Sequence, residues 1–273
     1  MSDIQQRIDL IQGLAQRMQT VLVDLSEEDW ARPSACDAWE VRDVLGHLIG
    51  GAERQIENLK RGLNGESGPP EGFVPLDADG ISANNARTYV ALRESLGDRL
   101  LSVFNQRYEE LGETLNSLGA DKWDTLCWHM RRGIMTAEDY VDLRIQEMTI
   151  HDWDMRSAFD PDCRLDADCV VRLLEIAPMW LGMTFRPGTD IPEARVFRFE
   201  LDDHPSHSHD VSVTGSKFQV GPASSRQADA LLRCDGDSYL LYIYGRIDST
   251  SLRLKIEAEP ALMGQFEAWF KGL

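Results

Sequence analysis

TAEDYVDLRIQEMTIHDWDMRSAF, residues 136–159, is a helix-forming segment with charged side chains on its apolar side. Thr136 can cap the backbone three residues further on, which predicts that the helix starts there. In projection, one broad arc holds the apolar residues Tyr140, Val141, Leu143, Met148, Ile150, Met155, Ala158 and Phe159. Four polar residues project into the middle of that arc, namely Arg144, Glu147, His151 and Asp154. The projection places on the opposite, solvent-facing side Gln146, Thr149, Arg156 and Ser157. The pattern therefore predicts a helix that turns polar groups toward the protein interior.

Two further helical segments lie near the start of the chain. Residues 4–25 repeat apolar side chains at spacings of three and four, which is typical of an amphipathic helix, and residues 41–59 do the same. A capping box formed by Asp37 and Glu40 is expected to start the second of these helices.

The segment between these helices and residue 136 divides into a loop and a long helix. Residues 62–80 are rich in glycine and proline, so they predict a long loop. Residues 82–118 keep helical spacing without proline, which predicts one very long helix. Four helices in about 160 residues, with short or irregular links, predict an antiparallel four-helix bundle over residues 1–162.

The sequence pattern changes after Pro161. Helical segments are expected at residues 167–185, 239–246 and 260–271. Alternating or β-rich segments predict strands at residues 195–201, 211–213, 217–220, 228–234 and 252–257. The predicted fold class is therefore α+β, with the helical bundle followed by a small α+β domain over residues 163–273.

The composition is that of a globular protein with a strong negative charge. Lys and Arg number 28 against 46 Asp and Glu, a net charge of −18 that repels phosphate backbones and anionic membrane surfaces. No apolar stretch approaches the about 20 residues of a membrane span, and the first residues do not resemble a secretory signal. We expect a cytoplasmic protein that acts on a small molecule, without a nucleic-acid or membrane partner; a homodimer is left open. The five cysteines form no C-x-x-C pair, which predicts reduced thiols.

The buried polar group of residues 136–159 has two interpretations. Glu147 and His151 are one helical turn apart and can reach a single ion, and His47, on the helix at residues 41–59, is a candidate third ligand. Because it lies on the flank of that helix's apolar stripe, the ordinary alternative for His47 is a surface or half-buried histidine. Two histidines and one carboxylate match the open ligand shell of a catalytic zinc. The alternative is a buried hydrogen-bond network that only specifies how the helices pack.

Segments of this bundle resemble the amino-terminal domain of mycothiol-dependent maleylpyruvate isomerases, which belong to the DinB-like metal-binding bundles. The matching segments are WARPS at 30–34, WEVRDVLGHL at 39–48 and EMTIHDWDMR at 147–156. In that family, the histidine of the segment that corresponds to residues 39–48 and the E-x-x-x-H residues of the segment that corresponds to residues 147–156 hold a divalent metal, usually zinc. The resemblance therefore implies His47, Glu147 and His151 as metal ligands. From about residue 166 the chain resembles the sterol-carrier-like domain that often follows this bundle, above all in ADALL at 228–232 and YIYGR at 242–246.

The resemblance also implies a reaction class. A bound metal favours the thiolate form of a low-molecular-weight thiol such as mycothiol, and the thiolate is the nucleophile. The thiol can add to an activated double bond and leave, which gives isomerisation, or remain attached, which gives S-transfer. Arg246 matches an arginine that the isomerases use beside the substrate, and a guanidinium suits a substrate carboxylate. The ordinary alternative for Arg246 is an interaction with the end of a helix.

A hypothesis of a different class is a non-catalytic carrier, in which the second domain binds a lipid or another small molecule and the metal is structural.

Three other features have ordinary explanations. The histidines of residues 204–209 are expected in a solvated hairpin loop, and Cys36 is expected to be a packed thiol. Asp154 is better placed to orient a ligand than to be one, because metal-bound histidines usually donate their other N–H to an acceptor.

Overall fold

The computed structural model describes residues 3–37, 39–76, 78–186, 194–224 and 226–272. Contacts within the chain divide it into two units, Met1–Asp166 and Ala167–Leu273. The sequence placed this division after residue 162. The first unit is mainly helical and the second combines helices with a sheet, so the predicted α+β fold class is confirmed.

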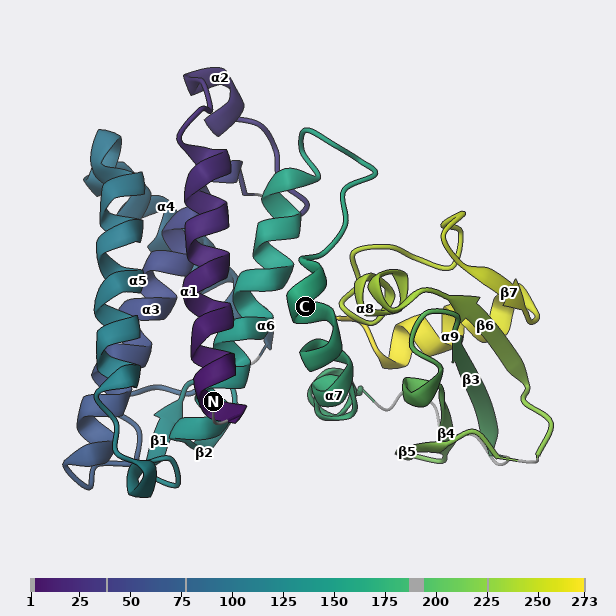
Figure 1. Cartoon of the computed structure of the whole chain (residues 1–273). Coiled ribbons are helices and arrows are strands. Elements are labelled where there is room, and N and C mark those ends of the chain that lie inside the picture. The colour runs from purple at the N-terminus through teal and green to yellow at the C-terminus, as the bar shows by residue number, and fades with distance from the viewer. Residues whose placement is uncertain (1–2, 38, 77, 187–193, 225, 273) are drawn as a thin grey trace. The chain divides into compact units, whose positions relative to one another are not determined.

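The first unit is a four-helix bundle with one further long helix and several short elements (Figure 1). Its helices are α1 (Asp3–Leu22), α2 (Glu27–Trp30), α3 (Val41–Leu63), α4 (Ala78–Leu96), α5 (Leu100–Asn116) and α6 (Ala137–Arg156). A hairpin of β1 (Leu126–His129) and β2 (Gly133–Thr136) precedes α6. Helices α1 and α3 each pack against both α5 and α6, which closes the bundle around one core. Fully buried side chains of the four bundle helices α1, α3, α5 and α6 fill that core, including Ile11, Leu48, Phe104, Leu111 and Val141. Each contributes about 1.5–3 kcal/mol through removal from water.

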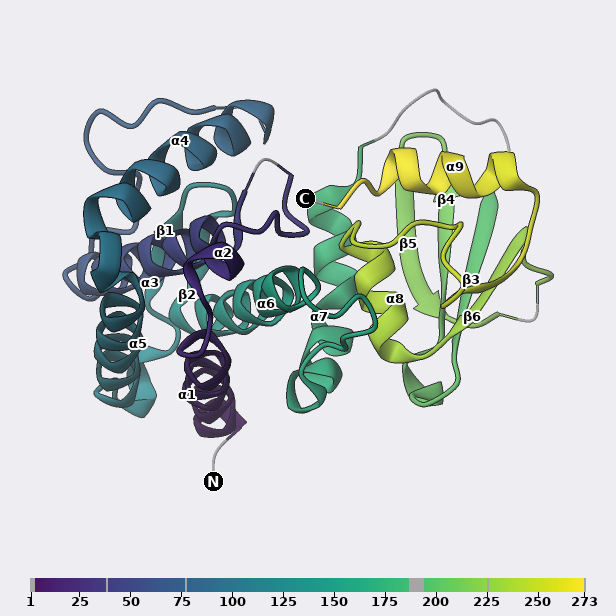
Figure 2. The same ribbon diagram turned by 90° about the horizontal axis from the view of Figure 1, so that it is seen from above.

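The prediction of one long helix at residues 82–118 is wrong, because the chain bends in the middle of this segment. Helix α4 ends at Leu96, and a 3₁₀ turn at Gly97–Arg99 separates it from α5. Gly97 has a φ of 51°, a left-handed conformation that is favourable only for glycine and stops an α-helix. Figure 2 shows that α4 and α5, on either side of this turn, run in different directions.

The start of α3 also differs from the prediction. The helix begins at Val41, with Glu40 as its N-cap, and the backbone N–H of Glu40 donates to a carboxylate oxygen of Asp43 at 3.0 Å. The capping box expected from Asp37 was therefore placed three residues too early. Backbone hydrogen bonds that include Ser34 N–H to the Trp39 carbonyl (2.9 Å) hold the residues before the helix in a turn. The loop expected at residues 62–80 is confirmed for residues 64–76, which contain no helix or strand. Its expected ends are helical, since residues 62–63 belong to α3 and residues 78–80 to α4.

Helix α6 starts as predicted but is buried on more sides than expected. Thr136 caps it by accepting from the backbone N–H of Asp139 at 3.0 Å. Gln146 and Thr149, expected to face solvent, are 2% and 0% exposed. Their polar atoms are satisfied, because Gln146 accepts from Arg132 at 3.0 Å and the Thr149 hydroxyl donates to the Ile145 carbonyl at 2.7 Å. Helix periodicity alone did not predict this burial.

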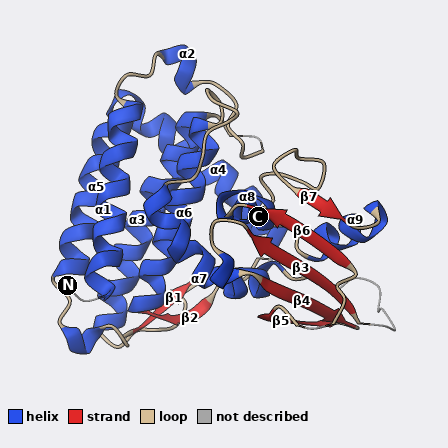
Figure 3. Ribbon diagram, turned by 45° about the vertical axis from the view of Figure 1, so that its right-hand side comes forward, coloured by secondary structure: helices blue, strands red, loops and turns tan. Residues whose placement is uncertain are grey.

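The second unit is a five-stranded sheet with helices on one face, in the order β5-β4-β3-β6-β7 (Figure 3). Its strands are β3 (Arg195–Leu201), β4 (His209–Thr214), β5 (Lys217–Pro222), β6 (Ala230–Cys234) and β7 (Lys255–Glu257). Its helices are α7 (Ala167–Thr184), α8 (Gly236–Ile243) and α9 (Pro260–Trp269). Only the β3–β6 pair is parallel among the described strands. Alternate residues of β3 pack against α8 and α9, as shown by Phe199 beside Tyr239 and Phe266.

Most elements predicted for the second unit are confirmed, with shifts of a few residues. Helix α8 begins at Gly236, earlier than expected, because Asp235 caps it by accepting from the Ser238 N–H at 2.8 Å. Among the described residues, no helix has the length and apolar character that crossing a membrane requires.

Candidate metal centre

The three residues expected to hold a metal lie together in the first unit. The ligand atoms of His47 on α3 and of Glu147 and His151 on α6 are all within 4.8 Å of one another. Nε2 of His47 is 3.0 Å from Oε2 of Glu147, and Nε2 of His151 is 3.7 Å from the same oxygen. Tetrahedral ligands with bonds of about 2.1 Å stand about 3.4 Å apart, so these separations are compatible with one ion between the three atoms.

Two glycines of α3 allow the neighbouring helix to approach His47. A Cβ at Gly50 would lie 2.5 Å from Cε1 of Tyr89, and a Cβ at Gly46 would lie 3.1 Å from the Tyr89 carbonyl oxygen. Any side chain at Gly50 would therefore displace the Tyr89 ring. As a result, the Tyr89 ring packs edge-on against the His47 ring at 4.8 Å between centroids.

His47 has the properties of a neutral metal ligand. It is 7% exposed, and its Nδ1 atom has no hydrogen-bond partner. Burial lowers the pKa of His47 to about 4, although its hydrogen bond with Glu147 opposes that shift. A neutral imidazole is the form that binds metals, so the buried site keeps His47 ready for coordination near neutral pH.

Glu147 supplies the negative charge of the group. Burial tends to raise its pKa, but the hydrogen bond from His47 and the charges of His151 and Arg144 hold the pKa of Glu147 well below its usual value. Its side chain is 30% exposed, whereas that of His47 is 9% exposed. The carboxylate therefore offers the side from which a small molecule can approach the three ligands.

His151 is oriented by Asp154, as the sequence predicted. Nδ1 of His151 lies 2.8 Å from Oδ2 of Asp154, which is fully buried, so Nε2 is directed to the Glu147 side. Burial tends to lower the pKa of His151, but the nearby Cys36 and Asp154 raise it to about 10. A metal at Nε2 must displace a proton, and its binding releases that proton.

Cys36 lies closer to this group than the sequence analysis suggested. Its thiol donates to Oδ2 of Asp154 at 3.0 Å, and Sγ is 3.6 Å from Nδ1 of His151. Cys36, His151 and Asp154 make a second set of atoms with metal-binding spacing. Each of the five cysteines is a thiol outside any disulfide, and Cys36 is the one that is not buried.

Two aromatic residues of the site were missed from the sequence. Trp39 and Tyr89 both lie against His47, at ring distances of 5.1 and 4.8 Å. The available signal was the glycine pair of α3, because glycines four residues apart on one helix face indicate that another element packs closely there.

Arg246 belongs to the second unit, just beyond α8. Gly245 has a φ of 74°, and the Arg246 N–H donates to the Leu241 carbonyl at 2.8 Å, which completes a Schellman turn. The guanidinium of Arg246 donates to the Tyr244 carbonyl at 3.0 Å. Arg246 therefore lies past the helix end rather than in its last turn.

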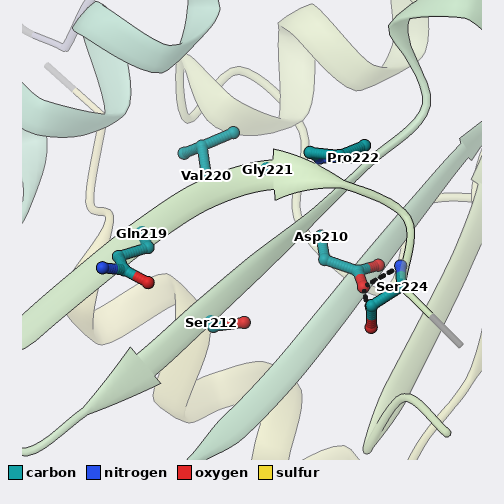
Figure 4. A pocket seen from close by; sticks show the side chains of 7 residues that line it. All are labelled: Asp210, Ser212, Gln219, Val220, Gly221, Pro222 and Ser224. Atoms are coloured by element: carbon teal, nitrogen blue, oxygen red, sulfur yellow. Dashed lines mark hydrogen bonds between the residues drawn. The ribbon is translucent and has the colours of Figure 1, made fainter. Parts of the chain in front are cut away.

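The histidine segment and the carboxylate pocket of the second unit make structural contacts. Residues 205–207 form a 3₁₀ turn between β3 and β4, and His209 pairs with the Tyr239 hydroxyl at 2.9 Å. A pocket of about 370 Å³ lies beside β4 and β5 (Figure 4). Its carboxylate, Asp210, accepts hydrogen bonds from Ser224 and Arg198, so its charge is already balanced.

Comparisons with known proteins agree with this architecture. The family model described as the mycothiol maleylpyruvate isomerase N-terminal domain matches residues 11–156, a range that includes His47, Glu147 and His151. No curated protein matches the chain. Two solved structures of a mycothiol-dependent maleylpyruvate isomerase, one of them a histidine-to-alanine mutant, share the fold with a TM-score of 0.64. Each is 15% identical in sequence, and each match covers 94% of this chain and 93% of the other. Because the family model matches more than half of the chain, this protein belongs to the mycothiol maleylpyruvate isomerase N-terminal domain family.

Proposed function

We propose that this protein is a metal-dependent enzyme that uses a low-molecular-weight thiol on a small electrophilic substrate bearing a carboxylate. The thiol is mycothiol or a similar molecule, and the metal is zinc. The reaction is isomerisation, as the names of the family and of the similar structures suggest, or transfer of the thiol to the substrate.

The observation that carries the proposal is the convergence of His47, Glu147 and His151 from two helices. Two histidines and a carboxylate form a ligand set typical of catalytic zinc, which retains a position for a reactant. When bound there, zinc supplies Lewis acidity that favours the thiolate form of a coordinating thiol.

The side chains of the bundle have distinct tasks in such a reaction. Asp154 fixes the ring of His151 through Nδ1, and the partly exposed side of Glu147 admits the reactants. The thiolate sulfur adds to an activated carbon–carbon double bond, and the electron pair of that bond moves toward the electron-withdrawing group. Rotation about the resulting single bond followed by loss of the thiolate gives the isomer, whereas protonation at carbon gives the thioether. Arg246 is the residue that we propose to bind the substrate carboxylate in the second unit.

The test is a turnover assay with purified protein, mycothiol and maleylpyruvate, with product isomers separated by chromatography. We expect a rate that requires both the thiol and the metal, so that treatment with a chelator abolishes it and added zinc restores it. If a zinc-loaded protein shows no thiol-dependent turnover, a second assay with other electrophilic carboxylates, scored for loss of free thiol, distinguishes S-transfer from isomerisation. Failure of both assays, together with lipid that copurifies with the protein, would favour the carrier hypothesis.

A further inference from the structure

We propose that Arg54, supported by Arg144, forms an anion-binding subsite beside the metal ligands and takes a carboxylate group of the substrate. The inference rests on the proposed function for the position of the reacting atoms, and it adds a binding group from the first unit to that function.

The first supporting observation is that the two guanidinium groups lie along the same face of α3 as His47. Residues 47, 51 and 54 of α3 share a face because they are four and seven positions apart. Gly51 has no side chain, and a Cβ there would lie 2.7 Å from Nη1 and 3.1 Å from Nη2 of Arg144. The Arg144 guanidinium therefore fills the gap left by Gly51, between His47 and Arg54.

The second observation is that neither arginine forms a close ion pair with an acid, although the charge of Arg144 acts on Glu147. Other arginines of the bundle pair with acids, for example Arg107 with Glu53 at 2.8 Å and Arg93 with Asp43 at 2.9 Å. Among the residues that the structure describes, neither Arg54 nor Arg144 has a carboxylate at ion-pair distance. In a chain with a net charge of −18, two such cations beside one another leave a local positive charge for a ligand to neutralise.

The third observation concerns hydrogen-bond donors that the fold leaves unused. Arg144 is 3% exposed; its Nε donates to Gln55 at 2.8 Å, but its Nη1 has no partner. The indole N–H of Trp39, whose ring lies 5.1 Å from that of His47, is also buried without a partner. A buried donor without an acceptor destabilises the protein, and a bound anion would supply the missing acceptor.

The positive charge also acts on a nearby histidine. Burial lowers the pKa of His129 to about 3, and the charges of Arg132, Arg54 and Arg144 act in the same direction. His129 accepts from the backbone N–H groups of Arg131 and Arg132 through Nδ1, so the neutral ring carries its proton on Nε2. The uncharged Nε2–H of His129 is therefore a further hydrogen-bond donor in the region that Arg54 and Arg144 make positive.

The position of Arg54 indicates where the carboxylate would lie. Arg54 donates to the Tyr89 hydroxyl, and its Cζ is 5.3 Å from the centre of the Tyr89 ring, which itself contacts His47. Seven residues of an α-helix rise about 10 Å, so the subsite suits a carboxylate several bonds from the reacting carbon. A planar guanidinium can bind both oxygens of such a group.

The test is calorimetric titration of metal-loaded protein with succinate, a small carboxylate without an electrophilic carbon. Arg54→Met is compared with Lys60→Gln, which removes the same charge from an exposed side chain of the same helix. We expect succinate to bind the parent and Lys60→Gln with affinities within about twofold, and to bind Arg54→Met at least about tenfold more weakly. N-acetylcysteamine, an uncharged thiol, is titrated in parallel and should bind all three proteins equally.

The outcomes separate this subsite from the proposed function. Metal content and thermal unfolding are measured on the same samples, so loss of metal or of fold is distinguished from loss of anion binding. Equal succinate binding by the parent and Arg54→Met, or no binding by the parent, would overturn the subsite. Weaker binding of N-acetylcysteamine alone would assign Arg54 to the thiol and would also overturn it.

Discussion

Alanine at His47, Glu147 or His151 is expected to reduce the metal content of the purified protein from about one ion per chain to nearly none. Each residue supplies one of the three atoms that converge within 4.8 Å. The two ligands that remain bind zinc too weakly to retain it through purification. The variants should keep their helix content, because apolar side chains of four helices form the bundle core. Elemental analysis and circular dichroism of each variant measure the two quantities.

The matched controls come from the same residue types outside the site. Glu57→Ala removes an exposed carboxylate from α3, and His207→Ala removes a histidine from the second unit. Both should retain the metal content of the parent. Full metal content in all three ligand variants would refute the metal centre, and so would a parent protein that takes up no zinc.

Replacing Arg7 by methionine is expected to lower the free energy of unfolding by about 3–5 kcal/mol. Arg7 is 4% exposed and joins α1 to α6, because it binds Asp142 at 3.2 Å and also Glu138. Its removal leaves the buried charge of Asp142 without this counter-ion, and the cost of such a charge is the reason for the large effect. Chemical denaturation followed by circular dichroism gives the free energy.

The controls for Arg7 separate the buried pair from an exposed one. Arg7 also contacts Asp3 at 2.8 Å, but Asp3 is 73% exposed in its side chain, so Asp3→Ala should cost less than about 1 kcal/mol. The double variant Arg7→Met with Asp142→Leu should recover most of the stability, since no buried charge remains unpaired. A small effect of Arg7→Met alone would show that the pair does not hold α1 against α6.

The sequence predicted the elements whose signals are local. Thr136 is the N-cap of α6 because a hydroxyl can accept from a backbone N–H three residues ahead, and that requirement is visible in sequence. The strands of the second unit were visible as alternating or β-rich residues, although α8 starts earlier than expected. The bundle followed from helical spacing in four segments.

The elements that were missed depend on single residues or on tertiary contacts. Gly97 breaks the expected long helix through one positive φ angle, which helical periodicity does not register. The β1–β2 hairpin is short, and its turn is set by Gly133 with a φ of 73°. Gln146 was assigned to solvent because helix projection cannot anticipate the acceptor role that it has toward Arg132.

The candidate site shows the same division. Glu147 and His151 could be paired from their spacing on one helix, His47 was a candidate from the neighbouring helix, and a family resemblance implied all three as ligands. Tyr89 and Trp39 could not be placed beside His47, because they approach it from other parts of the chain. Arg54 shares a helix face with His47, but only the structure shows that it has no acidic partner within the described part of the chain.

The measurement that addresses thiol activation most directly is a titration of mycothiol into cobalt-substituted protein, followed by near-ultraviolet absorption. We predict a sulfur-to-cobalt charge-transfer band that saturates at about one thiol per chain, because a thiol that reaches the open position binds as a thiolate. Glu147→Ala, which should hold no cobalt, should show no band. If the parent holds one cobalt per chain and mycothiol leaves its spectrum unchanged, the metal does not bind the thiol and the proposed function is wrong.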